Sequence, residues 1–334
     1  MITIQSYSTA VIMLFFVLLS WGSWPNTMKF APKDWKFQLF YWDFGLGMLL
    51  FSLVLAFTMG STGSEGRSFI EDLKQADPKF LWLALLGGVI YNFYNILLIS
   101  GVSLAGIAVA FPIGVGMALV FGTIANYIVN PVGNLIILLL GLLAVIVAII
   151  LVSLAYKKLT ANTQKTPLKV ILMLFVGGIA GTFWYMLVAK SMSANQVVLE
   201  PGKLGPYSSV VMFTVGIIIS NFLFNTLLMK KPLEGEPVPF GDYLKKGSVK
   251  THSLGILGGI ICCFGMNFSI LASGAAGFAI SYGLAQTCTM VAALWGIFIW
   301  KEFRNAPQGT NKYLVFMFLF YFIGISMLIL SRNY

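Results

Sequence analysis

Charged side chains are scarce in this sequence. Asp, Glu, Lys and Arg make up 10% of its 334 residues, whereas soluble globular domains carry about 25%. The stretch from Phe80 to Tyr156 contains no charged residue and no histidine. A helix needs about 20 apolar residues to cross the roughly 30 Å hydrocarbon core of a bilayer, so this stretch alone is long enough for three crossings. The scarcity of charge excludes a soluble protein and indicates one that crosses a membrane several times.

Histidine and cysteine are also rare. His252 is the only histidine, and its place at the predicted start of a helix favours a solvated or interfacial group over a catalytic triad. Cys262, Cys263 and Cys288 lie in apolar stretches without a histidine or acid spaced for a metal site. The phosphate-binding pattern Gly-x-x-x-x-Gly-Lys-Ser/Thr does not occur. We therefore expect no catalytic residue, no metal and no cofactor.

Apolar length and the charged breaks between apolar stretches predict an all-α integral membrane protein with ten transmembrane helices. Very short connections at 101–104, 128–133 and 274–275 make the helices they join antiparallel neighbours. The predicted helices span residues 8–28, 37–59, 80–100, 105–127, 134–156, 168–190, 205–229, 253–273, 276–299 and 312–331.

Lysine and arginine are divided unevenly between the two sides of the predicted membrane. The loops after the first, third, fifth, seventh and ninth helices contain fifteen of them, and the other side, with both termini, contains six. Basic loops tend to stay in the cytoplasm. The sequence thus predicts a bacterial cytoplasmic membrane protein with both termini extracytoplasmic. Because topology explains the net charge of +10, no nucleic-acid partner is expected.

The two halves of the chain resemble each other. Leu86-Gly87-Gly88-Val89-Ile90 corresponds to Leu257-Gly258-Gly259-Ile260-Ile261 at an offset of 171 residues. Five crossings in each half is an odd number, so the second half must be inserted in the opposite sense. We predict two inverted five-helix repeats, residues 1–160 and 161–334, which is the arrangement of secondary transporters with a site between the halves. The alternative is a chance similarity of two glycine-rich hairpins.

The first apolar helix is interrupted at Trp21-Gly22-Ser23-Trp24-Pro25-Asn26. Proline lacks a backbone N–H and crowds the preceding turn, so the helix should kink or end there. In hydrocarbon such a break is tolerated only where protein covers it or where it faces a water-filled cavity. We interpret the break as the wall of a substrate pathway. The alternative is a kinked packing helix with interfacial aromatic residues.

Uncharged polar and aromatic side chains near mid-depth indicate what such a pathway would bind. Tyr91, Asn92 and Asn95 can face one side of a helix, because residues three and four apart are neighbours. Amides donate and accept hydrogen bonds, and aromatic faces stack on rings. The set suits a neutral ring-shaped polar solute, either a sugar or a nitrogen heterocycle, although each amide alone could instead join two helices. The predicted substrate-binding residues are Trp21, Trp24, Asn26, Tyr91, Asn92, Asn95, Trp184, Asn267, Gln286 and Thr287.

Asp43 is the one acid that falls inside an apolar span. An intramembrane carboxylate costs roughly 2.5–3.5 kcal/mol, so a partner is expected, and Lys29 across the short turn is the predicted one. Asp43 could carry protons or accept a hydrogen bond from the substrate. Alternatively, the Lys29–Asp43 pair is a gate or a plain interfacial salt bridge. Glu200 and Lys203 form a second predicted pair, with an outer gate as its functional interpretation.

The sequence contains three further short motifs to compare, Trp21-Gly22-Ser23-Trp24-Pro25, Tyr41-Trp42-Asp43-Phe44 and Gly205-Pro206-Tyr207-Ser208-Ser209. Together they resemble the drug/metabolite transporter superfamily, in its branch of ureide permeases and glucose/rhamnose porters. This resemblance covers the whole chain in helix number and order. It implies a ten-helix carrier of a small polar metabolite, with the fifth and tenth helices peripheral and often at a homodimer contact. Plant ureide permeases have a longer central loop with a nucleotide-like motif, which 157–167 lacks, so their substrates (allantoin, uracil and relatives) serve only as an analogy.

These inferences together predict a secondary active transporter that takes up a sugar, a ureide or a nucleobase-like heterocycle by alternating access, coupled to protons. Its expected partners are the small-molecule substrate, the lipid bilayer and a second copy of the chain. An exporter of metabolites or drugs from the same superfamily is the first alternative. A lipid-modifying membrane enzyme is disfavoured because histidines and acids do not cluster at one membrane face. A channel is disfavoured because the chain has its own two-fold repeat and no ring of charges.

Overall fold

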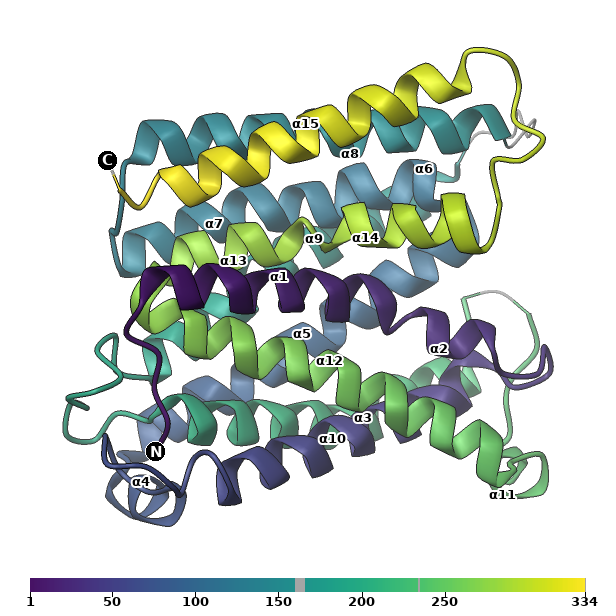
Figure 1. Cartoon of the computed structure of the whole chain (residues 1–334). Coiled ribbons are helices and arrows are strands. Elements are labelled where there is room, and N and C mark those ends of the chain that lie inside the picture. The colour runs from purple at the N-terminus through teal and green to yellow at the C-terminus, as the bar shows by residue number, and fades with distance from the viewer. Residues whose placement is uncertain (160–165, 234, 334) are drawn as a thin grey trace.

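The computed structural model describes residues 1–159, 166–233 and 235–333, and this part of the chain folds into helices joined by loops (Figure 1). Ten helical stretches within it are long and apolar enough to cross a membrane, which confirms the predicted all-α membrane fold. The predicted boundary between the repeats, at 160 and 161, lies outside the described residues. The ten spans are Tyr7–Lys29, Phe37–Phe57, Pro78–Ala105, Ile107–Val129, Leu135–Leu159, Leu168–Ser191, Pro206–Lys230, Val249–Ala276, Phe278–Ile299 and Thr310–Leu330.

Several spans are built from more than one helical segment, and two short helices, α4 and α11, lie in the loops. Two segments are π-helical, η1 and η2, and each lies within or at the end of a span. The segments are α1 (Tyr7–Ser23), α2 (Asn26–Lys29), α3 (Phe37–Phe57), α4 (Phe69–Gln75), α5 (Pro78–Ala105), α6 (Ile107–Ala110), η1 (Phe111–Val115), α7 (Gly116–Val129), α8 (Leu135–Leu159), α9 (Leu168–Ser191), α10 (Pro206–Lys230), α11 (Asp242–Lys245), α12 (Val249–Ala276), α13 (Phe278–Gln286), α14 (Cys288–Leu294), η2 (Trp295–Ile299) and α15 (Thr310–Leu330).

Helices α5 and α12 are longer than predicted, and each ends at a glycine with positive φ. The value is 74° at Gly106 and 88° at Gly277. Glycine has no Cβ to clash in this region, so the chain reverses directly into the next helix and the predicted connections at 101–104 and 274–275 are helical. The two helices have the same length, 28 residues. The start of α12 follows the start of α5 by 171 residues, and so do their last residues, which is the offset between the two glycine-rich motifs.

The predicted break in the first span is confirmed. Helix α1 ends at Ser23, and the helix resumes after Pro25 as α2. The amide nitrogen of Asn26 donates to the carbonyls of Gly22, at 3.4 Å, and of Ser23, at 3.2 Å. These carbonyls lie at the break that proline makes, so the Asn26 side chain replaces backbone hydrogen bonding there.

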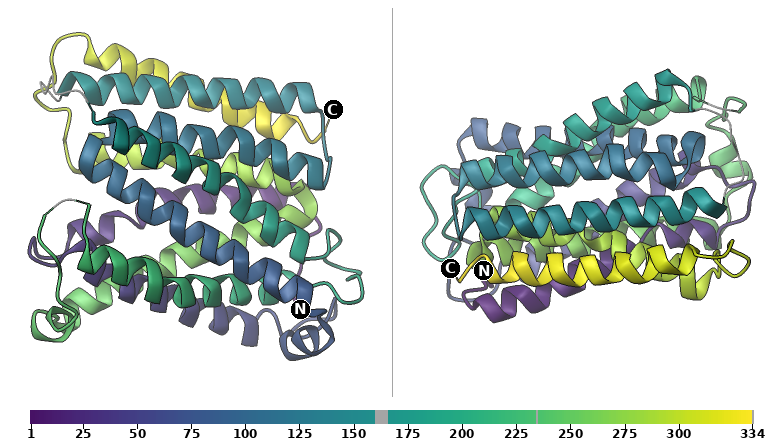
Figure 2. Two further views of the ribbon diagram at one scale, coloured as in Figure 1. Left: turned by 180° about the vertical axis from the view of Figure 1, so that it is seen from behind. Right: turned by 90° about the horizontal axis from the view of Figure 1, so that it is seen from above.

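The helices pack in matching pairs (Figures 1 and 2). Helix α5 lies against α9 and α10, and α12 lies against α1 and α3. Helices α8 and α15 lie against each other at one edge of the molecule, as the family resemblance implies for the fifth and tenth helices. The homodimer contact predicted through these two helices stays a prediction.

Glycines allow two of these pairs to approach closely. A Cβ at Gly47 of α3 would lie 2.2 Å from the carbonyl oxygen of Ile256 on α12, and a Cβ at Gly216 of α10 would lie 2.1 Å from that of Leu85 on α5. No side chain fits at either position, and close backbone contact of this kind is the usual way that membrane helices associate.

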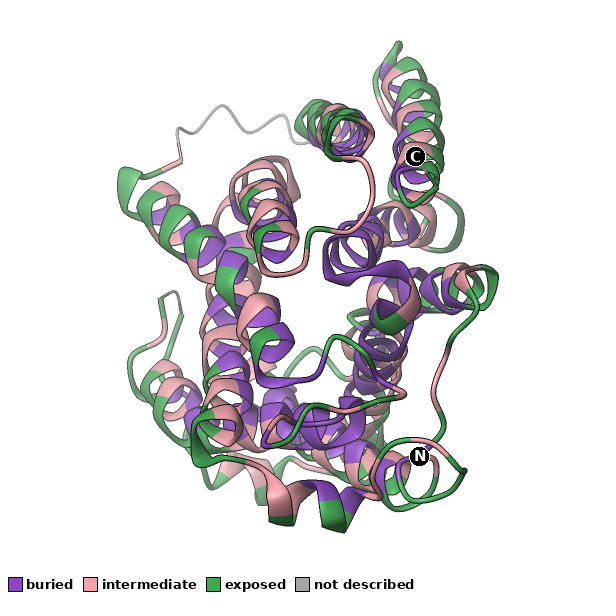
Figure 3. Ribbon diagram, turned by 90° about the vertical axis from the view of Figure 1, so that its left-hand side faces the viewer, coloured by how far each residue is buried: buried purple, intermediate pink, exposed green. Residues whose placement is uncertain are grey.

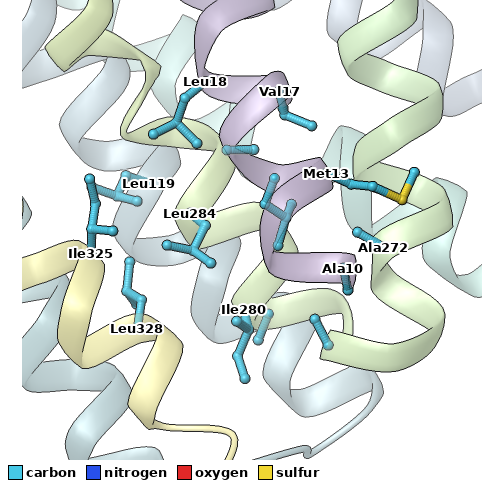
Figure 4. Close-up of a cluster of buried hydrophobic side chains, with 14 of the residues drawn as sticks. Ala10, Met13, Val17, Leu18, Leu119, Ala272, Ile280, Leu284, Ile325 and Leu328 are labelled. Carbon is cyan, nitrogen blue, oxygen red and sulfur yellow. The ribbon is translucent and has the colours of Figure 1, made fainter. Parts of the chain in front are cut away.

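Apolar side chains fill the space between α1, α12, α13 and α15. Met13 and Val17 of α1, Leu284 of α13 and Ile325 of α15 belong to one buried cluster (Figure 4). Viewed along the helices, buried faces point inward and exposed faces outward (Figure 3). Large apolar side chains such as Phe16 are exposed on the outside, as expected of a surface in contact with lipid.

Candidate functional site

A cavity of about 340 Å³ lies between α1, α2, α3, α5, α9 and α14. Small-molecule sites span about 300–1,000 Å³, so the cavity can hold a compact solute. Aromatic and aliphatic side chains form most of its wall. Seven of the ten predicted substrate-binding residues line it, namely Trp21, Trp24, Asn26, Tyr91, Asn95, Trp184 and Gln286.

Aromatic rings from three helices meet at one part of the wall. The ring centroid of Trp184 on α9 lies 6.1 Å from that of Trp21 on α1 and 5.2 Å from that of Tyr91 on α5. The indole N–H of Trp21 donates to the carbonyl of Cys262 at 3.1 Å, which fixes the ring. Gly265 makes room for it, because a Cβ there would lie 2.6 Å from the indole. The Trp184 ring plane is tilted by 57° to that of Trp21 and by 71° to that of Tyr91. The three rings therefore form a fixed, angled aromatic wall, in which a planar solute can stack on one ring and contact the others.

Two amides lie at the edge of this aromatic surface. The amide nitrogen of Asn95 donates to the hydroxyl of Tyr41 at 2.9 Å, which sets the orientation of the amide. Gln286, the last residue of α13, is 6% exposed and lines the cavity just before the helix is interrupted at Thr287. An amide presents both a donor and an acceptor, so the wall offers stacking surfaces and hydrogen-bonding groups side by side.

Three predicted substrate-binding residues lie outside the cavity wall. Asn92 donates to the hydroxyl of Ser220 on α10 at 2.8 Å, so it joins two helices. Asn267 donates to the carbonyl of Cys263 on its own helix at 3.0 Å. The hydroxyl of Thr287 donates to a carbonyl one turn earlier. Asn92 does not share a face with Tyr91 because consecutive helical residues point about 100° apart. The alternative given above, that an amide joins two helices, therefore holds for Asn92.

Sequence reasoning missed several wall residues. Leu98 and Val102, which it missed, line the cavity on the same face of α5 as the predicted Tyr91 and Asn95, and Tyr94 lies beside them. Their spacing of three and four residues is the signature of one helix face. That spacing was present in the sequence, but apolar residues at these positions are also typical of ordinary packing, so only the polar ones stood out.

The predicted ion pair between Lys29 and Asp43 is wrong. Asp43 is 1% exposed and faces α12, where Gly255 leaves space for its side chain. Its carboxylate accepts a hydrogen bond from the Tyr243 hydroxyl and lies 3.0 Å from Nδ1 of His252. Burial and the neighbouring carboxylate raise the pKa of Tyr243, so its hydroxyl stays protonated and donates. Asp43 does not line the cavity.

Lys29 instead forms an ion pair with Glu302, just beyond η2. The Lys29 ammonium lies 2.8 Å from one carboxylate oxygen of Glu302, and the Tyr156 hydroxyl donates to the other oxygen at 2.7 Å. Lys29, Tyr156 and Glu302 line the cavity at the end where α2, α8 and η2 meet, which we call the cavity mouth. No signal in the sequence links these residues, because they are far apart along the chain.

The opposite end of the molecule, where both termini lie (Figure 1), carries a separate polar network. Asp72 on α4 is 2% exposed. Its carboxylate forms an ion pair with the Arg67 guanidinium at 2.9 Å and accepts a hydrogen bond from the backbone N–H of Gly205 at 2.7 Å. The predicted Glu200–Lys203 ion pair is present beside it at 2.8 Å, with Glu200 exposed and Lys203 partly buried. Neither residue of that pair lines the cavity, and its gating role stays a prediction.

Comparison with other proteins places the sequence among membrane permeases. A sequence profile of the ureide permease family matches residues 40–173 and 168–331. Ureide permease 1 of Arabidopsis thaliana is 21% identical over an alignment that covers 100% of both chains. Ureide permease 2 of the same plant is 23% identical, with 100% of this chain and 99% of the relative covered.

A solved crystal structure shares the fold. It superposes with a TM-score of 0.62, at 15% identity, and covers 98% of this chain and 99% of that one. The relatives named above are plant proteins, so a bacterial membrane and the orientation of the termini stay predictions. The ten apolar spans and the permease relatives make the protein an integral multi-pass membrane transporter rather than an enzyme. On the family match over most of its length, the chain belongs to the ureide permease family.

Proposed function

We propose that this protein carries a small neutral ureide or a related nitrogen heterocycle across the membrane, and that the solute binds in the cavity between α1, α5 and α9. The observation that carries the proposal is the aromatic wall formed by the rings of Trp21, Tyr91 and Trp184, which lie at steep angles to one another, with the amides of Asn95 and Gln286 beside it. A ureide is flat and bears N–H donors and carbonyl acceptors. Aromatic faces complement its plane, and amides complement its edge.

Alternating access between two inverted halves is part of the proposal. It is supported by the matched lengths of α5 and α12, by the equivalent glycine turns at Gly106 and Gly277, and by the matching packing partners of the two halves. Repeats of this kind allow one half to rock against the other around a fixed site. The Arg67–Asp72 network would close the cavity at the end where the termini lie. The cavity mouth would face the cytoplasm, which the basic loops at that end support.

Proton-coupled uptake completes the proposal. Asp43 and His252 lie 3.0 Å apart at the basic end, and His252 is partly open to solvent. Ionisable groups inside membrane spans commonly mark proton paths. The pair lies outside the cavity wall, so it would act by changing how α3 and α12 pack rather than by touching the solute.

Uptake of radiolabelled allantoin by proteoliposomes tests the binding site. We expect saturable uptake by the wild-type protein, with competition by hydantoin and uracil and none by glucose. Gln286→Leu keeps the side-chain size but removes the amide, and each lost hydrogen bond is worth about 0.5–1.5 kcal/mol. The KM for allantoin should therefore rise by about two- to tenfold, since 1.4 kcal/mol is a factor of about ten.

Ser281→Ala is the matched control on the same helix. The Ser281 hydroxyl is buried, lies outside the cavity wall and has no hydrogen-bond partner among the described residues. Its removal should leave the KM unchanged. Competition by glucose but not by hydantoin would contradict the ureide proposal, and equal KM values for Gln286→Leu and Ser281→Ala would remove this cavity as the binding site.

A further inference from the structure

Opposite charges stand together at the cavity mouth. Among the described residues, Lys29 and Glu302 are the charged side chains that line the cavity. Their ammonium and carboxylate groups lie 2.8 Å apart, and the two side chains are 48% and 29% exposed. A solute that enters from this end passes both groups, and water can reach both of them.

The surrounding residues hold the Glu302 carboxylate in place. Lys301, directly before it, has a φ of 53° and is the one non-glycine with positive φ in the part of the chain that the structure describes. Such backbone conformations are uncommon and tend to occur at functional sites. Gly296 leaves the space in which Tyr156 reaches the carboxylate, because a Cβ there would lie 2.6 Å from the tyrosine oxygen and 2.9 Å from a carboxylate oxygen.

The Lys29 ammonium is held as well. It lies 4.9 Å from the ring centroid of Trp300, a cation–π contact. The Trp300 indole N–H in turn donates to the Asn26 side chain at 2.6 Å. Burial alone would raise the pKa of Glu302, but the hydrogen bonds from Lys29 and Tyr156 hold it below its ordinary value. The Glu302 carboxylate is therefore ionised at neutral pH, and its negative charge offsets the positive charge of the Lys29 ammonium beside it.

We infer that the Lys29–Glu302 pair is a charge filter that sets the specificity of the cavity for neutral solutes. The fixed carboxylate cancels the field of the ammonium, so neither anions nor cations are enriched at the mouth. As a statement about transport, the inference rests on the proposed function. It distinguishes a closed-ring ureide, which is neutral, from its ring-opened ureido-carboxylate, which is an anion of similar size.

Access of charged reagents to Cys288, a native thiol in the cavity wall, measures the filter without any transported solute. The purified full-length protein is treated with anionic sulfonatoethyl methanethiosulfonate or cationic trimethylammonioethyl methanethiosulfonate. Mass spectrometry of peptides resolves Cys288 from the buried Cys262 and Cys263. The ratio of the two rates reports charge selectivity, because the intrinsic reactivity of the thiol cancels.

Glu302→Gln leaves the ammonium unpaired and should raise the anion-to-cation ratio by about tenfold. One charge about 6 Å away in water changes the local concentration of each ion by about threefold, in opposite directions for the two reagents. Lys29→Gln should lower the ratio by a similar factor. The exchanged pair, Lys29→Glu with Glu302→Lys, should return the ratio to that of the wild type. Added salt should shrink the effects of both single variants.

Asp242→Asn is the matched control. Asp242 pairs with Lys246 at 2.7 Å with similar exposure, but neither residue lines the cavity. This variant also leaves an unpaired lysine and should not change the ratio. The filter would be overturned if Glu302→Gln changed the anion-to-cation ratio at Cys288, relative to the wild type, by no more than Asp242→Asn does. If Glu302→Gln does not fold, the opposite shift in Lys29→Gln and the recovery in the exchanged pair carry the same test.

Transport of hydantoin and of N-carbamoylglycine, its ring-opened anion, separates the two proposals. With a working filter, the wild type takes up hydantoin in preference, and Glu302→Gln gains uptake of N-carbamoylglycine relative to hydantoin. If the Cys288 ratio responds but neither solute is taken up, the filter stands and the proposed function fails. If hydantoin is taken up and neither the Cys288 ratio nor the solute preference responds to Glu302→Gln, the filter fails and the proposed function stands.

Discussion

Asp43 stands out in the sequence because it is the one acid within an apolar span. Its burial, at 1% exposed, agrees with that signal, but its partners do not follow from the sequence. Tyr243 reaches it from α11, in the loop between α10 and α12, and His252 reaches it from the first turn of α12. The sequence predicts Lys29 as the partner because it ends the first helix, across a short turn from the helix that carries Asp43. Distance along the chain gives a poor guide to partners when the helices between are antiparallel and closely packed.

Asp43→Asn tests whether this carboxylate carries protons. An inward gradient of about one pH unit can drive up to about tenfold accumulation per proton, since one pH unit corresponds to about 1.4 kcal/mol. We expect the wild type to accumulate allantoin in proteoliposomes under such a gradient. Asp43→Asn cannot release a proton, so it should equilibrate allantoin without accumulating it and keep normal counterflow exchange.

Tyr243→Phe is the control for this measurement, because it removes one hydrogen bond to Asp43 and keeps the ionisable carboxylate. Accumulation should survive in that variant. Undiminished pH-driven accumulation by Asp43→Asn would remove Asp43 from the proton path and leave its pairing with His252 as a structural contact.

At the scale of helices, the sequence predicts much of the fold. Apolar length locates all ten spans, and Pro25 locates the break between α1 and α2, because both signals are local. The π-helical segments η1 and η2 could not be predicted, since they depend on how neighbouring helices press on the chain. The roles of single polar residues were also open. Asn92 and Asn95 look alike in sequence, but one joins α10 and the other lines the cavity.

Close helix contact also gives a prediction at this scale. A Cβ at Gly88 on α5 would lie 1.9 Å from the carbonyl oxygen of Phe213 on α10, which is backbone and cannot move aside easily. Gly88→Ala should therefore destabilise the protein by about 1–3 kcal/mol, the usual cost of overpacking. Thermal unfolding in detergent, followed by size-exclusion chromatography, measures the change.

Gly116→Ala is the matched control, because the nearest atom to a Cβ there is 3.8 Å away. Alanine favours helix over glycine, so this variant should be as stable as the wild type or more stable. Equal melting temperatures for Gly88→Ala and Gly116→Ala would show that the α5–α10 contact is looser than the structure has it.

At the scale of the whole molecule, helices from both halves of the chain surround one cavity. Trp21 and Tyr91 come from the first half, and Trp184 and Gln286 come from the second. The cavity mouth lies at the basic end, and the Arg67–Asp72 network lies at the end with the termini. The sequence predicts that the halves enclose a site. It does not predict which end is closed, because loop contacts such as that of Asp72 with Gly205 join segments more than a hundred residues apart.

The most direct test of this account is a cryo-EM structure of the full-length protein with allantoin bound. We predict density for the ring against Trp184, between Trp21 and Tyr91, with its polar edge within hydrogen-bond distance of Asn95 or Gln286. Density for the ligand at any other place, or a lipid chain in the cavity under saturating allantoin, would contradict the account.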